Sequence, residues 1–213
     1  MEHKFGHTIE SYFQDDYQVA GRYDLPLVRR QDFDLTDLKL LRFSSVVRGD
    51  ERDLDATVHF FEDDERFDEV WKNPAAYLDE LKRYKQLLSP DFSLYTDMPL
   101  ILQIINTYRS RWCGAYWQSQ GLIVAPSIAW SDERSFPFCF DGIEQGSVVA
   151  VSTLGCRDVK DLFMAGFEKM CEVIKPVTVI CYDKPFSEMR DLSQVLEVPY
   201  VRNARLALAT QGD

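Results

Sequence analysis

The chain has 213 residues, of which 46% are hydrophobic, and carries a formal net charge of −11. This length can bury one good core, and the composition is that of a globular domain. The negative charge disfavours bare nucleic acid as a partner. The sequence contains no apolar run of 18 residues, so it does not predict a membrane span.

The first residues contain no basic region followed by an apolar stretch, so we expect a cytoplasmic protein without a secretory signal. Five cysteines occur without a CxxC pair, together with three histidines. This pattern gives little support to a zinc site and indicates reduced thiols. We assign no metal ligand from the sequence.

Residues 1–20 are polar with scattered aromatics, and we expect them to form a loosely packed arm before a single domain over 21–213. Acidic residues gather over 50–80, where twelve Asp and Glu face three basic residues. This segment is either a solvated helix face and loop or a docking surface for a basic partner.

Apolar, β-prone runs recur along the chain, and most are continuous rather than alternating. Continuous runs are typical of strands that are buried on both faces of a parallel sheet. The expected strands are 26–28, 40–47, 57–61, 92–95, 122–125, 147–152, 177–182 and 198–201. Helical spacing predicts helices over 67–88 (split near Pro74), 99–118, 158–174 and 186–196.

Alternating strands and helices predict an α/β fold of βα repeats around a mainly parallel sheet. We favour a small or incomplete TIM-barrel-like form, and an open doubly wound sheet is the alternative. Neither GxGxxG nor GxxxxGK[ST] occurs, which removes the main sequence evidence for a nucleotide-binding open sheet.

Ligands of parallel α/β folds bind at the carboxyl ends of the strands, so the residues that follow each expected strand are site candidates. Asp97 and Asp183 follow two of these strands, and we predict them as the catalytic acid and base. The predicted substrate-binding residues are Asp63, Asn106, Arg109, Trp130 and Thr153. Converging carboxylates can also bind a divalent cation, and the sequence otherwise leaves the cofactor unknown.

Each candidate also has a plain structural interpretation. Asp97 can cap the following helix, and Asp183 stands in a common turn sequence. Arg109 can clamp a phosphate or simply pair with an acidic neighbour. The aromatic loop over 130–142 is either a lid or a hairpin arm packed on the core. Cys156 precedes a helix but has no histidine partner in view.

The block over 91–130 resembles a bacterial and phage family known as a domain of unknown function, family 4417, and the resemblance extends over about residues 22–185. The matching residues are Asp91 to Tyr95, Asp97, Pro99, Asn106, Tyr108, Arg109, Trp117, Gly121, Pro126, Trp130, Phe138 to Gly142 and Val149 to Ser152. The resemblance implies proteins carried by phages, plasmids and other mobile elements, and it transfers no catalytic residue.

Two hypotheses follow. The first is an enzyme that acts on a small polar, nucleotide- or sugar-like substrate at the carboxyl ends of the strands. The second is a non-catalytic protein that binds a host protein through the acidic 50–80 surface. The sequence does not assign an oligomeric state.

Overall fold

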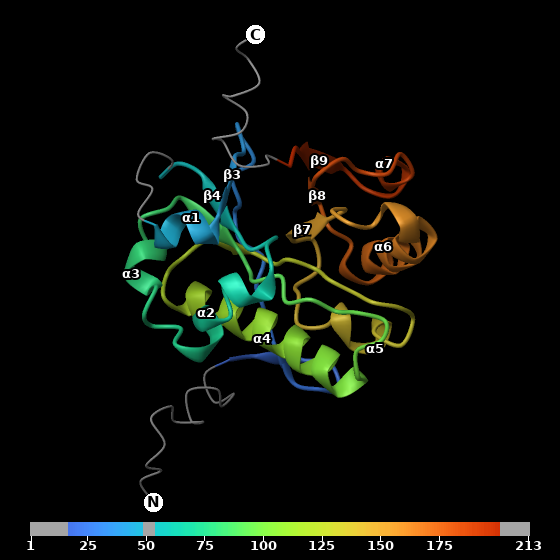
Figure 1. Ribbon diagram of the computed structural model, residues 1–213, viewed down its shortest axis with the longest axis horizontal. Coiled ribbons are helices and arrows are strands. Elements are labelled where there is room, and N and C mark those ends of the chain that lie inside the picture. The colour runs from blue at the N-terminus through green and yellow to red at the C-terminus, as the bar shows by residue number, and fades with distance from the viewer. Residues whose placement is uncertain (1–16, 49–53, 201–213) are drawn as a thin grey trace, which may run out of the picture.

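The fold was analysed in a computed structural model that describes residues 17–48 and 54–200. Its strands form a four-stranded sheet, a three-stranded sheet and a small antiparallel pair (Figure 1). The first sheet contains β3 (Leu40–Arg42), β4 (Thr57–His59), β5 (Gln86–Leu88) and β6 (Val124–Ala125). The second contains β7 (Val148–Ser152), β8 (Thr178–Tyr182) and β9 (Val195–Val198). Strands β1 (Val19–Ala20) and β2 (Leu25–Pro26) form the pair.

Both larger sheets are parallel, and their strands lie side by side in chain order. An isolated parallel bridge between Ser127 and Ala150 joins the end of β6 to β7. A doubly wound sheet reverses its strand order, and the described strands show no reversal. No ladder joins β9 back to β3 within the described ranges, so the hydrogen bonding there does not close a barrel.

The helices divide between the two sheets (Figure 1). Beside the first sheet lie α1 (Phe43–Val47), α2 (Glu69–Lys72), α3 (Leu78–Leu81) and α4 (Leu100–Ser119). Beside the second lie α6 (Lys160–Ile174) and α7 (Met189–Leu192). The short α5 (Phe136–Cys139) belongs to the segment between β6 and β7, and the 3₁₀ turns η4 (Asp64–Arg66) and η5 (Arg157–Val159) precede α2 and α6.

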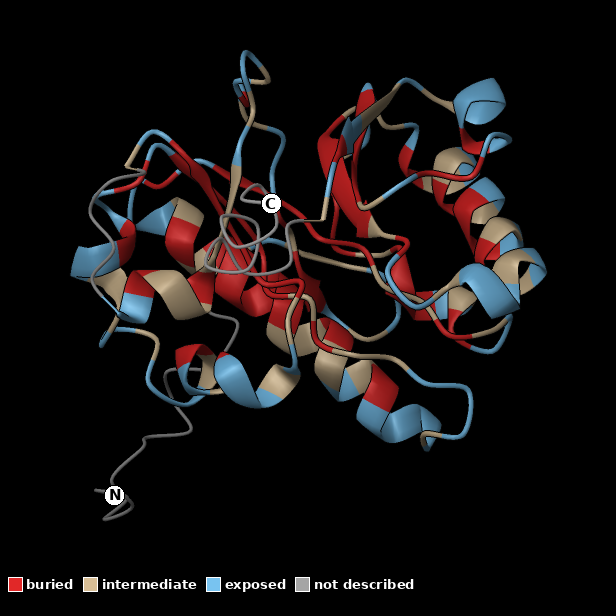
Figure 2. Ribbon diagram, turned by 45° about the horizontal axis from the view of Figure 1, so that its top comes forward, coloured by how far each residue is buried: buried red, intermediate tan, exposed pale blue. Residues whose placement is uncertain are grey.

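Buried residues form three hydrophobic clusters. One lies between the first sheet and its helices, and one lies between the second sheet and α6. The third takes residues from strands of both sheets, including Leu88, Ala125, Ala150, Ile180 and Val198. Figure 2 shows that the strands are largely buried, and exposed residues lie in the first turns of α4 and along the outer face of α6.

The segment before β3 covers the amino ends of the strands. Phe33 packs into the third cluster, and the side chain of Gln86 holds the backbone of Asp34. The amide of Gln86 also donates to the Thr57 hydroxyl at 3.0 Å. These hydrogen bonds satisfy polar groups at that end of the sheet, which would otherwise be costly to bury.

The predictions for α4 and α6 are confirmed, because long runs without internal Pro carry an apolar stripe there. The predicted helix 67–88 is wrong in its last part. After Pro74 only α3 forms, and Gln86–Leu88 is the central strand β5. Neighbours on both sides override the local helical preference of Lys85–Leu88, since these residues pair with β4 and β6.

Four other predicted elements differ from expectation. The predicted strand 92–95 is a loop that follows β5, and the predicted strand 40–47 turns into α1 after Arg42. The end of the chain differs as well, because α7 is only one turn long and β9 begins before the predicted strand 198–201. Strands therefore end earlier than the apolar runs suggest.

Residues 1–16 of the expected arm over 1–20 lie outside the described residues. Tyr17 packs edge to face on Trp112, and Val19–Ala20 pairs with β2. The five cysteines are free thiols. Within the ranges that the structure describes, no helix is both long and apolar enough to cross a bilayer.

Candidate functional site

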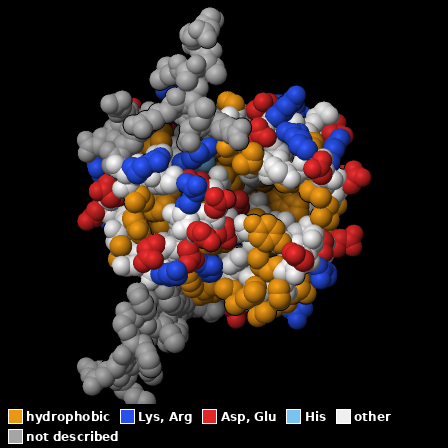
Figure 3. All heavy atoms as spheres, in the orientation of Figure 1, with side chains coloured by type: hydrophobic (Ala, Val, Ile, Leu, Met, Phe, Trp, Pro, Cys, Tyr) orange, Lys and Arg blue, Asp and Glu red, His pale blue; other side chains and the backbone are white. Residues whose placement is uncertain are grey.

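A cavity of about 490 Å³ lies at the carboxyl ends of the parallel strands. Its lining comes from the segments that follow β3, β4, β5, β6, β7 and β9, together with Phe163 of α6. Figure 3 shows a hollow near the centre of this face, with acidic, basic and hydrophobic side chains around it. The volume falls within the range of small-molecule sites, and the position is the usual ligand site of parallel α/β folds.

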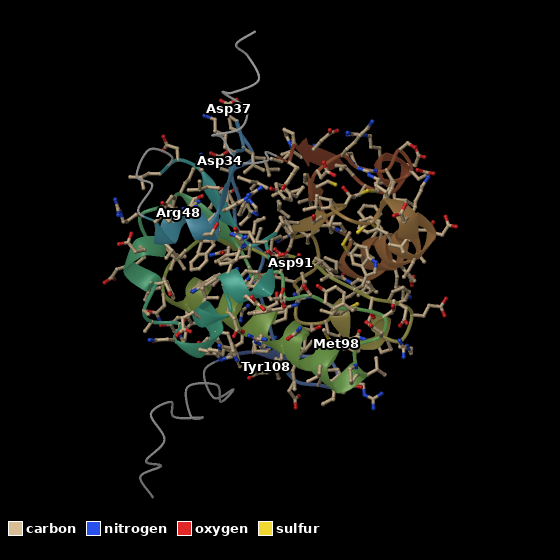
Figure 4. All side chains as sticks on the ribbon, viewed as in Figure 1. Asp34, Asp37, Arg48, Asp91, Met98 and Tyr108 are labelled. Carbon is tan, nitrogen blue, oxygen red and sulfur yellow. The ribbon has the colours of Figure 1, made fainter. Side chains whose placement is uncertain are left out.

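Asp91 is the most perturbed carboxyl group of this cavity. It follows β5 by three residues, is half-buried and lines the cavity near the centre of the molecule (Figure 4). Among the described residues, no hydrogen bond or ion pair engages its carboxylate. Burial raises the pKa of Asp91 to about 7, the nearby Asp64 raises this pKa further, and Arg111 opposes the rise.

The neighbouring Asp64 is bound by the backbone that follows Asp91. Its carboxylate accepts hydrogen bonds from the backbone N–H and the hydroxyl of Ser93, the latter at 2.8 Å. These bonds tie the loop after β4 to the loop after β5. The nearby carboxylate of Asp64 disfavours ionisation of Asp91, because two like charges repel each other.

Arg111 is a buried cation behind the cavity. Its guanidinium donates to the carbonyls of Ser127, Cys139 and Asp141 at distances of 3.1, 2.6 and 3.0 Å. Burial lowers the pKa of Arg111 to about 10, so it remains charged at neutral pH. Arg111 thus anchors the segment between β6 and β7 to α4 and supplies the positive charge that limits the pKa of Asp91.

Trp130 forms an aromatic wall of the cavity. Its indole packs on Phe163 of α6 and lies so close to Gly166 that a methyl group there would come within 2.1 Å of Nε1. The aromatic loop over 130–142 contains the short α5 with Phe138 and Phe140 buried. It is therefore packed on the core, as one of the two expectations had it, although as a helix rather than a hairpin.

Cys156 lines the cavity as a neutral thiol. Burial raises its pKa, the charge of Asp91 adds to the rise, and Arg157 opposes it. A raised pKa removes the thiolate that nucleophilic catalysis requires. His59 lies below the cavity among Phe61 and Tyr182, and burial together with Arg42 lowers its pKa to about 3. His59 is therefore neutral at pH 7.

The structure brings only two of the predicted site residues into the cavity lining. These are Asp63, which pairs with Arg66 at 3.3 Å, and Trp130. Asp97 is exposed in the turn before α4 and lies outside the lining. Asp183 also lies outside it, with its backbone at φ 71° and its carboxylate 3.8 Å from Arg157.

The other three predicted residues have structural partners. Thr153 is buried, and its hydroxyl donates to the carbonyl of Lys184 at 2.9 Å. Asn106 donates to the carbonyl of Ser93 at 2.8 Å, and its side-chain oxygen accepts from Arg109. The guanidinium of Arg109 also pairs with Asp68 and lies 3.9 Å from the ring centroid of Phe92.

Part of the acidic stretch binds partners within the molecule. Glu62 accepts from the backbone and hydroxyl of Ser44 at the start of α1, Asp68 pairs with Lys72, and Glu80 pairs with Arg83. Asp50, Glu51 and Asp53 lie outside the described residues. In the part of the chain that is described, no three His, Cys, Asp or Glu side chains form a group that could hold a metal ion.

Sequence reasoning missed several residues of the cavity lining, among them Asp91 and Arg42. Both follow from the true strand ends, because β5 ends at Leu88 and β3 ends at Arg42. The Ser89-Pro90 pair directly after Leu87-Leu88 was the available signal, since Pro ends a central strand. The sequence predicted that the strand ends at Tyr95, which would place Asp97 at the carboxyl edge of the sheet. The strand in fact ends at Leu88, so Asp91 lies at this edge.

Comparison with known proteins assigns the chain to a family. Residues 17–199 match the family described as a domain of unknown function, DUF4417. The chain belongs to DUF4417. The match confirms the resemblance expected from the 91–130 block, and it covers both sheets and every residue of the cavity lining except Tyr200.

Two proteins of known phages are similar to this chain. The chain is 38% identical over 191 residues to the Gene 1 protein of Mycobacterium phage L5, an alignment that covers 86% of this chain and 81% of that protein. It is 42% identical over 146 residues to the Gene 1 protein of Mycobacterium phage D29, covering 67% of this chain and 54% of that protein. No solved structure matches the chain.

Proposed function

We propose that this DUF4417 protein is a phage- or mobile-element-associated enzyme that performs acid–base chemistry on a small polar, ring-containing substrate, with Asp91 as the group that transfers the proton. The observation that carries the proposal is the Asp91 carboxyl group, which lines a cavity, has no described hydrogen-bond partner and has a pKa of about 7. A general acid or base works best when its pKa is near the operating pH.

The cavity suits a nucleotide- or sugar-like substrate. Its polar lining includes Ser93 and Ser152, which can bind ring hydroxyls, and its aromatic lining includes Trp130 and Tyr95, which can stack on a ring. We further propose that the two sheets form an incomplete TIM-barrel-like fold. The sequential order of the parallel strands and the third cluster, which spans both sheets, support this arrangement.

A substitution series tests the assignment of Asp91. Purified protein is incubated with defined mixtures of nucleosides, nucleotides, sugars and sugar phosphates, and the products are followed by mass spectrometry. We expect the parent chain to turn over one of these substrates. Asp91→Asn should lower the rate of turnover at least a hundredfold, because general acid–base catalysis contributes about 10²–10⁴-fold to a rate.

Asp97→Asn and Asp183→Asn are the matched carboxylate variants outside the cavity lining. If they abolish turnover while Asp91→Asn does not, the catalytic pair predicted from the sequence stands and the role of Asp91 fails. The alternative function, host-protein binding through the acidic 50–80 surface, has less support because several of these acids pair within the molecule. Charge reversal at Asp63, Asp64, Glu65 and Asp68 tests it.

A further inference from the structure

A second, much smaller cavity adjoins Asp91, between α4 and the loops that follow β5 and β6. Its volume is about 10 Å³, compared with about 490 Å³ for the main cavity, and Asp91 lines both. A polar cavity needs about 10–15 Å³ to hold one water molecule, so the second cavity has the size of a single water site. Its lining is polar, because it includes the side chains of Asn106, Thr107, Ser110, Arg111 and Ser127.

Two of these side chains keep hydrogen-bonding capacity for a water molecule. The hydroxyl of Thr107 donates to the carbonyl of Gln103 at 3.0 Å, and its oxygen can still accept a hydrogen bond. The guanidinium of Arg111 uses four of its five N–H groups, in bonds to three carbonyls and to Ser110. Thr107 therefore keeps an acceptor and Arg111 keeps a donor, and the carboxylate of Asp91 adds a second acceptor.

Asp91 and Arg111 interact through charge without touching each other. The charge of Arg111 opposes the rise in the pKa of Asp91, yet no hydrogen bond or ion pair joins the two side chains among the described residues. A direct pair would place one or two short N–H···O bonds on the carboxylate. Two polar groups that face each other over a longer distance are commonly bridged by a water.

We infer that one water molecule binds in the second cavity and hydrogen-bonds the carboxyl group of Asp91, with Thr107 and Arg111 as the residues that position it. The water donates to Asp91 and to the Thr107 hydroxyl and accepts from the guanidinium of Arg111, which matches the roughly three hydrogen bonds of a typical buried water. One carboxyl oxygen of Asp91 is then fixed from the side of α4, and the other is left for a substrate in the main cavity. This positioning role rests on the function proposed above, whereas the water site does not depend on it.

A crystal structure of the full chain, at a resolution that shows ordered water, tests the site directly. We expect a water oxygen within about 3 Å of a carboxyl oxygen of Asp91, on the side of α4. A direct ion pair between Asp91 and Arg111 would overturn the inference. So would a second cavity that holds no water within hydrogen-bond distance of Asp91.

Substitutions test whether the water acts on Asp91. Thr107→Val removes the hydroxyl and keeps the size of the side chain, so the water loses a partner and supports the ionised carboxylate less well. The pKa of Asp91, measured by carbon-13 nuclear magnetic resonance, should therefore rise by at least about 0.5. Thr107→Ser keeps the hydroxyl and should leave this pKa close to that of the parent chain.

Thr178→Val is the matched control. Thr178 lies in β8, is buried like Thr107 and lines neither cavity. The same chemical change there should leave the pKa of Asp91 unchanged, although it removes a buried hydroxyl as well. The inference fails if Thr107→Val raises this pKa no more than Thr178→Val does.

Failure of the water site is distinguishable from failure of the proposed function. Turnover that depends on Asp91, without a water in the second cavity, retains the acid–base enzyme and removes the inference. A water bound to Asp91 and a raised pKa in Thr107→Val, without any turnover, retain the water site and remove the enzyme.

Discussion

Two aspartates at opposite ends of β5 have opposite environments. Asp34 lies against Lys85 and Gln86 at the start of the strand, where its carboxylate accepts from Lys85 Nζ at 2.5 Å and from the backbone of Thr36. These hydrogen bonds, that with Lys85 first, lower the pKa of Asp34 to about 2. Asp91 follows the other end of the strand, where burial raises its pKa to about 7. Figure 4 shows Asp34 at the edge of the molecule and Asp91 near its centre.

The two ends of β5 thus place one aspartate in a set of hydrogen bonds that stabilises the fold and the other at the edge of a cavity. At the amino end, the side chain of Gln86 binds the backbone of Asp34 and the hydroxyl of Thr57, which satisfies polar groups at that end of the sheet. At the carboxyl end, the carboxylate of Asp91 faces a cavity without a described partner, which costs stability whenever it is ionised. An unfavourable environment of this kind is typical of functional sites.

Replacing the cation near each aspartate should have the largest effect on stability, and this effect should differ between the two ends of β5. Arg111→Lys removes a fork that binds three carbonyls, and a single ammonium group cannot reach all of them. We expect a loss of about 3–5 kcal/mol in the free energy of unfolding, measured by urea denaturation. Lys85→Gln, at an exposed position, should change far less. Equal losses would contradict the comparison.

Removing the charge of each aspartate should have effects of opposite sign. Below pH 4 the Asp91 carboxyl is protonated in the folded and unfolded states alike, and its favourable contribution is lost as the pH rises toward 7. Asp91→Asn should therefore be more stable than the parent chain at pH 8, by up to about 4 kcal/mol. The difference should shrink as the pH falls from 7 to 4, which denaturation at a series of pH values will measure.

Asp34→Asn is the matched control for that experiment. The lowered pKa of Asp34 contributes stability above pH 4 that is lost as the pH falls through about 2. Asp34→Asn should therefore be less stable than the parent chain at pH 8. The account fails if both variants lose stability at this pH.

A smaller change tests how tightly the cavity wall is packed. Gly166→Ala places a methyl group against the indole of Trp130, and overpacking of this kind costs about 1–3 kcal/mol. Ala165→Ser, at the exposed neighbouring position of α6, is the control and should be nearly neutral. Near-ultraviolet circular dichroism should change only for Gly166→Ala, because only this variant displaces Trp130.

The sequence predicted the class of fold and a site at the carboxyl ends of the strands, but it did not predict most of the residues that line the cavity there. Continuous apolar runs identified β7 and β8 nearly to the residue, because β8 pairs with a strand on each side and β7 lies between β8 and the bridge to Ser127. The short β5 reads as the end of a helix, since its strand form comes from neighbours that are distant in sequence. Because of this error, the sequence predicted Asp97 rather than Asp91 as the carboxylate at the carboxyl edge of the sheet.

The roles of the two helix arginines were equally out of reach of the sequence. Arg109 and Arg111 are two residues apart, and composition does not distinguish them. The fold sends Arg109 to Asp68 and Phe92, whereas Arg111 enters the core beneath the cavity. The environment of each arginine depends on the segments that pack on α4. These segments come from residues 68–92 and 126–141.

Carbon-13 nuclear magnetic resonance of the aspartate carboxyl groups tests the central claim most directly. A pH titration of labelled protein, with Asp91→Asn and Asp34→Asn used to assign the two signals, measures both pKa values in the folded state. The account predicts that the Asp91 signal titrates near pH 7 and the Asp34 signal near pH 2. An Asp91 signal that titrates near pH 4 would contradict it, because that carboxylate would then be solvated or paired like any surface group.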